Sequence, residues 1–515
     1  MPETPGSPFL AHARLAELAR TRGDQPFIWE AHETGEPMTI AQLHDKASRL
    51  ATVLAGMGVR RGDRVHLQLS NRWEFLAAFF AASIMGAVIV PVSLRASLDE
   101  VAYSVELTQP TAGVVEAAGP EMLDLLTEIG LPSSALLAAG ASAGDAVVAL
   151  ADAVAAASPW SGPEEGRITD LLAVLYTSGV AGWPRGVMLT QANLRHAAIA
   201  YAAAARVQPT DRILISLPLS HIAGLGNMAL AALWTASSMG FTKPGPTWIR
   251  AAIRQQSTVA NLSAIEVREL LAAPPVESEE SVLRLVVFGP AVSTQLREEF
   301  EQRFGTELRL GYGATEAVAP IALSLPTVLP DEDYVGEALA PAALSVVDSS
   351  GAVVAAGEPG ELVVSGVPGV TLPAGYYGLP ELSRQVFGSG RWHSGDQVII
   401  ESDGRLRFLE RAADQFKAGL TTVSATAIER VMKEHVGVAD AAVVAVEKAG
   451  EAPVVVAFVE LSEFHPDLGV DELAGWVATR LGDESLPGRY VVVDALPYTE
   501  SGKVLKTRLV EWAAE

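Results

Sequence analysis

Short runs of β-branched and other apolar residues alternate with longer Ala- and Leu-rich segments, and this alternation constrains the fold more than any other feature. The short runs span residues 64–69, 87–92, 171–176, 213–216 and 285–288. Between them, segments such as 40–57 and 73–85 have the period of a helix. Strand–helix alternation is typical of α/β layers built on a largely parallel sheet. The first part of the chain is therefore predicted to be a multi-layer α/β domain.

The texture of the sequence changes after about Pro341. Short strands separated by Gly and Pro follow, as in GEPGELVVSG at 357–366, which indicates a more antiparallel region with mixed sheets. From Arg411 onward, small predicted strands and two predicted helices occupy a stretch long enough for a separate small α+β domain. A chain of 515 residues also exceeds what one compact domain usually holds. We therefore expect a large domain at 1–410 and a small one at 411–515.

The formal net charge of −24 argues against two kinds of partner. Such a charge repels nucleic acid and anionic membranes, so neither is expected as a partner. Cysteine is absent, which excludes disulfides and thiolate chemistry on the chain itself. The longest uncharged run, between Glu74 and Arg95, is interrupted by Gly86 and Pro91 and is predicted to be a buried helix and strand. With no signal-like N-terminus either, a cytoplasmic location without membrane insertion is expected.

A glycine-rich loop follows the predicted strand at 171–176. It combines two hydroxyl residues, three glycines and one basic residue, namely Thr177, Ser178, Gly179, Gly182, Arg185 and Gly186. Glycines allow backbone N–H groups to converge on a phosphate, and a basic side chain adds charge. The loop lacks the Walker pattern, and an ordinary β-turn remains an alternative at this point.

Four further segments carry residues suited to nucleotide chemistry. GYGATE at 311–316 offers an aromatic face, a hydroxyl and the carboxylate of Glu316 as a magnesium ligand. Asp396 follows a glycine turn and could accept hydrogen bonds from a ribose diol. His221 lies among apolar neighbours, and Lys503 follows a Ser-Gly turn. Taken singly, each has an ordinary reading as a core histidine, a solvated carboxylate or a turn residue.

The order and spacing of these motifs resemble the superfamily of acyl-CoA synthetases, peptide-synthetase adenylation domains and luciferases. The loop at 177–186 resembles T-S-G-T-T-G-x-P-K-G, and GYGATE resembles Y-G-x-T-E. HSGD at 393–396 resembles T-G-D, and Arg411 resembles the arginine of G-R-x-x-D. SGK at 501–503 resembles the terminal S-G-K. Weaker similarities lie at Asn71 and at 86–91, 289–291, 357–361 and 375–377. The resemblance spans nearly the whole chain.

The resemblance implies a two-domain enzyme with its active site between a nucleotide- and acyl-binding domain, 1–410, and a mobile lid, 411–515. A carboxylic acid attacks the α-phosphate of ATP, which gives an acyl-adenylate and pyrophosphate. The lid then rotates, and the thiol of coenzyme A attacks the adenylate, which gives a thioester and AMP. ATP or AMP, Mg²⁺ and coenzyme A are the implied ligands.

The resemblance also implies roles for individual residues. The nucleotide would be held by the loop residues named above, by an adenine pocket of Gly289, Pro290, Ala291, Tyr312 and Gly313, and by Asp396 and Arg411 at the ribose. Catalysis would use Thr315 at the α-phosphate, Glu316 at magnesium and Lys503 between the attacking carboxylate and the phosphate. His221 would gate an acyl pocket lined by Ala223, Gly224 and Ala314. Ala413, Lys417 and Gly419 would form the hinge and coenzyme A region.

The chain departs from the family pattern in the phosphate loop and at the hinge. Val180 and Ala181 replace hydroxyl residues, Arg185 replaces a lysine, and Ala413 replaces an acidic residue. An enzyme that performs only the thioester half-reaction, supplied by a separate adenylating partner, is therefore an alternative to a complete ligase. An adenylation enzyme that loads a carrier protein and a non-catalytic binding protein are further alternatives.

The substrate expectation comes from the segment around His221. LPLSHIAGLGNM at 217–228 holds no acidic residue that could pair with the ammonium group of an amino acid. Small side chains there favour a bulky, mostly apolar acid, such as a polycyclic or aryl acid of specialised metabolism. The retained residues of the implied nucleotide site argue against a binding protein.

Overall fold

The chain divides into two compact units. The computed structural model describes residues 9–30, 36–116, 119–140, 147–177, 184–242, 245–254, 256–274, 283–288, 294–324, 334–339, 343–411, 414–418, 421–446, 454–462, 465, 467–482, 487–499 and 504–514. Unit 1 comprises Met1–Gly179, Trp183–Leu344 and Val364–Trp392, and unit 2 comprises Val180–Gly182, Ser345–Val363 and His393–Glu515. The boundary expected between residues 410 and 411 stays a prediction.

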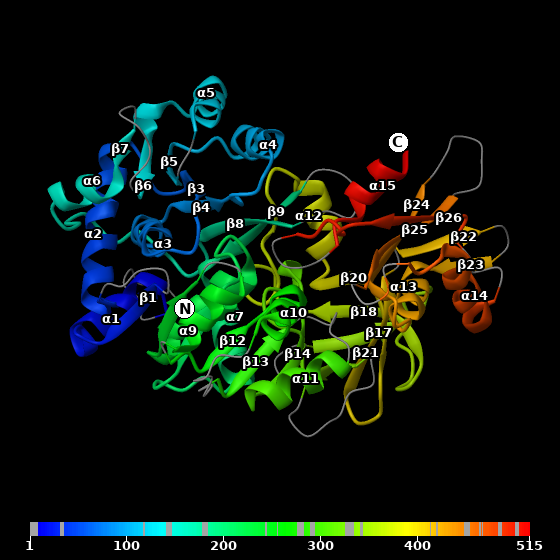
Figure 1. The fold of residues 1–515 in the computed structure, drawn as a ribbon. Helices are drawn as coiled ribbons and strands as arrows, with labels where there is room; N and C mark the ends of the chain where they lie inside the picture. Colours follow the sequence, from blue (N-terminus) through cyan, green and yellow to red (C-terminus); the bar gives the residue numbers. More distant parts are fainter. Residues whose placement is uncertain are drawn as a thin grey trace. The chain divides into compact units, whose positions relative to one another are not determined.

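The central sheet of unit 1 is built on six parallel strands. They lie in the order β14-β13-β12-β10-β11-β1, and Figure 1 shows β14, β13 and β12 as neighbours. Their bounds are β1 (Pro26–Glu30), β10 (Arg212–Ile215), β11 (Ser238–Phe241), β12 (Val259–Asn261), β13 (Leu285–Phe288) and β14 (Glu307–Tyr312). Short antiparallel strands extend both ends, namely β2 (Met38–Thr39), β15 (Ala322–Leu323) and β16 (Tyr334–Ala338). The strands predicted near 213–216 and 285–288 are thus present.

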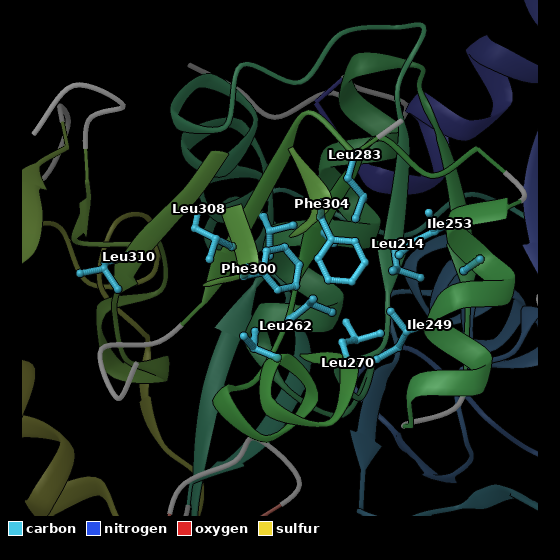
Figure 2. Packing of buried hydrophobic residues seen from close by; sticks show 14 of the residues in the cluster. Leu214, Ile249, Ile253, Leu262, Leu270, Leu283, Phe300, Phe304, Leu308 and Leu310 are labelled. Atoms are coloured by element: carbon cyan, nitrogen blue, oxygen red, sulfur yellow. The ribbon is translucent and has the colours of Figure 1, made fainter. Parts of the chain in front are cut away.

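Helices cover this sheet, in which β10, β12 and β13 are buried along nearly their whole length. Phe300 and Phe304 of α11 (Thr294–Phe304) pack with Leu262, Leu270 and Ile249 into a buried cluster (Figure 2). The other helices that contribute to the cluster are α9 (Pro246–Arg254) and α10 (Ala264–Ala272). This core positions the ends of the parallel strands.

The second sheet of unit 1 has the order β19-β9-β8-β4-β3-β5-β6-β7. The bounds are β3 (Arg64–Gln68), β4 (Val88–Pro91), β5 (Ala112–Glu116), β6 (Leu136–Ala139), β7 (Val148–Ala149), β8 (Leu171–Thr177), β9 (Arg185–Thr190) and β19 (Gly375–Tyr376). The six strands in the order β8-β4-β3-β5-β6-β7 pair in parallel with their neighbours. The remaining two pairs, β8 with β9 and β9 with β19, are antiparallel. The hairpin of β8 and β9 therefore brackets the predicted phosphate loop.

The uncharged run between Glu74 and Arg95 folds as predicted. The helix α3 (Trp73–Met85) is buried along nearly its whole length and ends at Gly86, whose φ of 69° is left-handed. A glycine adopts this conformation at a helix end without steric cost. The buried strand β4 follows. Among the described residues, no helix has the length and apolar character needed to cross a membrane.

The remaining helices of unit 1 surround the two sheets. They are α1 (Ala11–Arg22), α2 (Ile40–Gly56), α4 (Leu98–Thr108), α5 (Pro120–Glu128), α6 (Leu150–Ala156), α7 (Gln191–Ala204), α8 (Leu230–Thr235), α12 (Pro380–Phe387), the 3₁₀ turns η1 (Ser133–Ala135) and η3 (Thr315–Ala317), and the π-helix η2 (Ala223–Ala229). Capping boxes begin α2, α4, α7 and α10, which explains why Ser or Thr precedes each of them.

Unit 2 contains an antiparallel region and a small α+β part. Its strands and helices are β17 (Ala343–Val347), β18 (Pro359–Ser365), β20 (Arg391–Ile400), β21 (Arg405–Arg411), β22 (Gln415–Ala418), β23 (Thr421–Ser424), α13 (Ala425–Lys433), β24 (Val438–Val446), β25 (Val454–Leu461), α14 (Val470–Leu481), β26 (Arg489–Val493) and α15 (Lys506–Ala514). Two residues of each of the strands β17, β18 and β20 belong to unit 1, and the rest belong to unit 2. Within the described residues, three helices follow residue 411, one more than predicted. Both α13 and α15 have only nine residues, and α15 packs its apolar side against β24 and β25. The α/β fold with a small α+β C-terminal part is confirmed.

Candidate active site

The predicted acyl and nucleotide segments begin at one edge of the central sheet. The strands β10, β12, β13 and β14 are neighbours and run parallel, so their carboxyl ends lie at the same edge. Ligands of open α/β sheets bind at this edge. His221 lies in the segment that follows β10, and Tyr312 ends β14 and is followed by Gly313, Ala314 and Thr315. The predicted adenine residues after β13, namely Gly289, Pro290 and Ala291, lie outside the described residues.

Glu316 lies in the 3₁₀ turn Thr315–Ala317 and accepts two hydrogen bonds on one oxygen. The Thr177 hydroxyl donates to Oε1 over 3.4 Å, and the Tyr376 hydroxyl donates to the same atom over 3.3 Å. Thr177 is the last residue of β8, so the entrance of the phosphate loop contacts the predicted magnesium ligand. The structure thus brings together Thr177 and Glu316. The loop residues Ser178, Gly179 and Gly182 lie outside the described part of the chain.

The other end of the phosphate loop adjoins the same tyrosine. Arg185 begins β9, and its guanidinium lies 5.6 Å from the centre of the Tyr376 ring. Gly186 is buried, and its carbonyl accepts a hydrogen bond from the backbone N–H of Tyr377. Burial raises the pKa of the Tyr376 hydroxyl, so this group is protonated and can donate to Glu316. The sequence marked 375–377 only as a weak similarity and assigned Tyr376 no role.

Asn71 holds the segment that leads to His221. Its Nδ2 donates to the carbonyls of Ile215, at 3.2 Å, and Leu217, at 3.0 Å, and its Oδ1 accepts from the N–H of Leu219 at 2.9 Å. Three bonds to the backbone fix the path of the chain where β10 ends. The sequence noted Asn71 only as a weak similarity, and the structure gives it this structural role.

The π-helix η2 begins two residues after His221. π-Helices are rare and occur mostly at functional sites. Ala223 and Asn227, four residues apart, are half-buried, whereas Gly224 between them is buried. A Cβ atom added at Gly224 would lie 2.3 Å from the Pro218 carbonyl oxygen. The small size of Gly224 therefore serves close packing of two backbones. Its predicted place in the acyl pocket stays a prediction.

Unit 2 pairs the two residues predicted to hold the ribose. Asp396 of β20 lies opposite Arg411 of β21, and Arg411 Nε is 3.4 Å from Asp396 Oδ1. The sequence predicted a glycine turn before Asp396, but residues 391–400 form the continuous strand β20. Glu361 holds this part of the strand, because its carboxylate contacts His393 Nδ1 at 2.9 Å and the N–H of Gly395 at 3.1 Å. The φ of Gly395 is 73°, which only glycine adopts readily. Asp396 is 7% exposed, so β20 presents a mostly buried carboxylate.

The predicted lid residues are only partly covered by the structure. Lys503, Ala413 and Gly419 lie outside the described residues, and Lys417 is described only as a member of β22. Next to them in sequence, Lys506 Nζ lies 2.8 Å from Asp414 Oδ1 and 2.9 Å from Glu429 Oε1. The two carboxylates raise the pKa of Lys506 against the opposing effect of burial, so it is charged. The sequence did not single out this cluster.

The chemistry of these groups fits a magnesium ion held mainly by its substrate. No group of three potential metal ligands occurs within the described ranges. Mg²⁺ is commonly bound by one or two carboxylates together with phosphate oxygens and water. Glu316 supplies one such carboxylate beside the phosphate loop, so the residues present are compatible with magnesium-bound ATP.

Comparisons with known proteins agree with this arrangement. The chain matches the AMP-binding enzyme family over residues 15–377 and the AMP-binding enzyme C-terminal domain over residues 427–503. It is 31% identical to a feruloyl-CoA synthase from Amycolatopsis sp, over 93% of this chain and 95% of the relative. It is 26% identical to a long-chain-fatty-acid–CoA ligase from Mycobacterium tuberculosis, over 92% and 93%.

Solved structures show the same fold over nearly the whole chain. ATP-bound MatB from Rhodopseudomonas palustris is similar with a TM-score of 0.84 and 26% identity, over 98% of this chain and 99% of that one. A benzoate CoA ligase from Burkholderia xenovorans shares the fold with a TM-score of 0.84 and 24% identity, over 97% and 99%. The chain therefore belongs to the AMP-binding enzyme family and is an acid–thiol ligase that forms acyl-CoA through an acyl-adenylate.

Proposed function

We propose that this ligase activates a bulky, mostly apolar acid of the aryl type and transfers it to coenzyme A. The observation that carries the proposal is the surface after β10. Its half-buried side chains are Leu217, Pro218, His221, Ala223 and Asn227, which include no charged acid or base apart from the imidazole. A pocket for an apolar ligand is lined mainly by such side chains with few polar groups. The similarity to a feruloyl-CoA synthase, whose name specifies an aryl acid, supports the same class.

The residue roles implied by the family complete the proposal. Tyr312, Gly313 and the loop after β13 would bind adenine, and Asp396 with Arg411 would bind the ribose. Thr315 would contact the α-phosphate, while the Lys503 ammonium would balance charge as a carboxylate oxygen of the acid bonds to phosphorus and pyrophosphate leaves. Magnesium, held by Glu316 and the phosphates, would neutralise charge on the departing pyrophosphate.

The lid completes the proposed reaction. It is proposed to comprise residues 411–515 and to rotate near Ala413 before the thiol attacks. The thiol of coenzyme A would then lose its proton and bond to the acyl carbon, and AMP would leave. Removal of Lys503 from the site between the steps fits a residue carried on a moving part.

A thioester assay tests the substrate class. The protein is incubated with coenzyme A and a panel of preformed acyl-adenylates or with ATP and the free acids, including ferulate, benzoate, a long-chain acid and acetate. We expect aryl acids to exceed acetate in kcat/KM by at least about tenfold, the effect of a few well-packed apolar groups. Equal or better turnover of acetate would contradict the proposal. If no acyl-adenylate yields a CoA thioester, a carrier-protein thiol becomes the better acceptor.

Ala223 provides a sharper test of the pocket than Gly224. Ala223→Leu adds three carbon atoms at a half-buried position. The close contact with the Pro218 carbonyl oxygen involves the neighbouring Gly224, not Ala223. We expect kcat/KM for the preferred bulky acid to fall about tenfold or more and that for acetate to change much less. Ala203→Leu on the exposed face of α7 is the matched control. A uniform loss for all acids in the Ala223 variant would argue against a pocket role.

A second candidate is an enzyme that performs only the thioester half-reaction. The sequence of the phosphate loop favours it, because Val180 and Ala181 lack hydroxyl donors and Arg185 replaces lysine. The loss of two hydrogen bonds to charged phosphate oxygens costs about 10² to 10⁴ in rate. The β- and γ-phosphates have left before the thiol attacks, so thioester formation would be spared. A separate adenylating partner would then supply the acyl-adenylate.

Pyrophosphate release decides between the two candidates. It is measured for the unmodified protein and for the combined variant Val180→Thr, Ala181→Thr, Arg185→Lys, with thioester formation from preformed adenylate as the control in both. Release only in the combined variant supports the half-reaction enzyme. Robust release by the unmodified protein with its preferred acid excludes it.

A further inference from the structure

Tyr376 joins three elements that lie far apart in the sequence. Its hydroxyl donates to Glu316 Oε1 over 3.3 Å, next to the Thr177 hydroxyl at 3.4 Å from the same atom. Both bonds end on Oε1, and within the described part of the chain no recorded bond occupies Oε2. One oxygen of the carboxylate is thus held by the protein while the other keeps its lone pairs.

The position of Tyr376 is set by the scaffold and does not depend on Glu316. The Tyr376 N–H is 2.8 Å from the Ser383 hydroxyl oxygen, and that hydroxyl also lies 3.2 Å from the Tyr376 carbonyl. Tyr376 pairs with Val187 of β9, and its ring packs on Phe387 with centroids 5.2 Å apart. The side chain is 3% exposed. A donor held this firmly can orient the carboxylate that it contacts.

The ring of Tyr376 also adjoins the exit of the phosphate loop. The Arg185 guanidinium lies 5.6 Å from the ring centre, within the range of a cation–π contact. Thr177 and Arg185 are cross-strand partners at the two ends of this loop. Tyr376 therefore contacts the carboxylate with its hydroxyl and one end of the loop with its ring.

We infer that Tyr376 is a positioning residue for the nucleotide-activating step. Its hydroxyl orients Glu316 so that Oε2 is available to a magnesium ion bound with ATP. The inference rests on the proposed role of Glu316 as a magnesium ligand. Groups that hydrogen-bond a ligating carboxylate orient it, and their loss commonly lowers metal affinity by about 10- to 100-fold.

Tyr376→Phe is the deciding variant, because it removes the hydroxyl and keeps the buried ring. ATP binding is measured by calorimetry at increasing Mg²⁺ concentration, and AMP binding is measured without Mg²⁺. We expect the Mg²⁺ concentration that half-saturates the enhancement of ATP binding to rise about tenfold or more. AMP binding is expected to stay within about twofold, because AMP leaves the magnesium site unused.

Two controls separate orientation of Glu316 from general damage. Tyr377→Phe removes the hydroxyl of the adjacent half-buried tyrosine and is expected to leave the Mg²⁺ requirement unchanged. Glu316→Gln is expected to raise the Mg²⁺ requirement at least as much as Tyr376→Phe. The inference would be overturned if Tyr376→Phe left the Mg²⁺ requirement unchanged or if Tyr377→Phe shifted it equally. It would also be overturned if ATP binding by the unmodified protein did not depend on Mg²⁺. Because binding is read without turnover, a failure of the thioester assay leaves this result interpretable.

Discussion

A buried histidine predicts how the stability of unit 1 depends on pH. His66 lies in β3, between β4 and β5, and its side chain is 0% exposed. Burial lowers the pKa of His66 from 6.5 to about 4, and this effect exceeds the opposite effect of a contact with Gln68. The imidazole is therefore neutral in the folded protein under conditions in which the unfolded chain already binds a proton.

The sign and size of the effect follow from this difference in pKa. Between pH 6.5 and about 4 the unfolded state binds more protons than the folded state, so stability falls as the pH falls. The contribution of His66 is fully present above pH 6.5 and is lost progressively down to about pH 4. At about pH 5 the expected loss is about 2 kcal/mol relative to neutral pH. That is a large part of the stability of an ordinary domain.

Hydrogen exchange of the strand itself provides the assay. Peptides covering Arg64–Gln68 report opening of the unit that contains His66, and rates are corrected for intrinsic exchange at about pH 7.5 and about pH 5. We expect His66→Leu to reduce the difference in opening free energy between the two pH values by about 2 kcal/mol. His44 and His196, whose pKa values burial also lowers, remain in both proteins and cancel in the comparison. His465→Gln, at an exposed position, is the control. The same pH dependence in His66→Leu and the unmodified protein would refute the reasoning.

Three further predictions concern the nucleotide, the acyl segment and the lid. Asp396→Ala should weaken AMP binding at least about tenfold by calorimetry, since each charge-assisted hydrogen bond contributes about 1.5–3 kcal/mol, whereas unchanged affinity in a folded variant would exclude the ribose role. Gly224→Ala should lower the thermal midpoint by several degrees and reduce turnover of every acid alike, because its Cβ would meet the Pro218 carbonyl oxygen at 2.3 Å; a loss confined to bulky acids would show instead that the position lines the pocket. Lys506→Met should destabilise unit 2 by about 3 kcal/mol or more in urea unfolding, because two part-buried carboxylates lose their cation, while Lys506→Arg should retain most of the stability; equal effects of the two variants would contradict the charge argument.

Much of the fold could be predicted because the relevant signals are local. Apolar runs near 213–216 and 285–288 predict strands that become β10 and β13, and Gly86 predicts the end of a buried helix. The order of short motifs along the chain identified the family, because each motif needs particular residue types at fixed short spacing. One helix too few was predicted after residue 411, where α13 and α15 each have only nine residues, a length at which helix stability depends on tertiary packing.

The site shows where local signals end. Glu316 meets Thr177 across 139 residues and Tyr376 across 60 residues, and Asn71 reaches the N–H of Leu219 across 148 residues. The sequence shows that these residues can donate or accept hydrogen bonds, but the choice of partner depends on strand order and register. For this reason Tyr376 had no predicted role.

The sequence by itself determined the family, the α/β class and the residue types available for nucleotide chemistry, since these depend on short-range pattern and composition. Only the tertiary structure decided what surrounds each residue. Gly224 illustrates the difference. The sequence alone does not distinguish a small residue that lines a pocket from a small residue packed between two backbones. Backbone sterics are local and can be inferred along the chain, whereas burial and hydrogen-bond partners arise only when distant segments pack against each other.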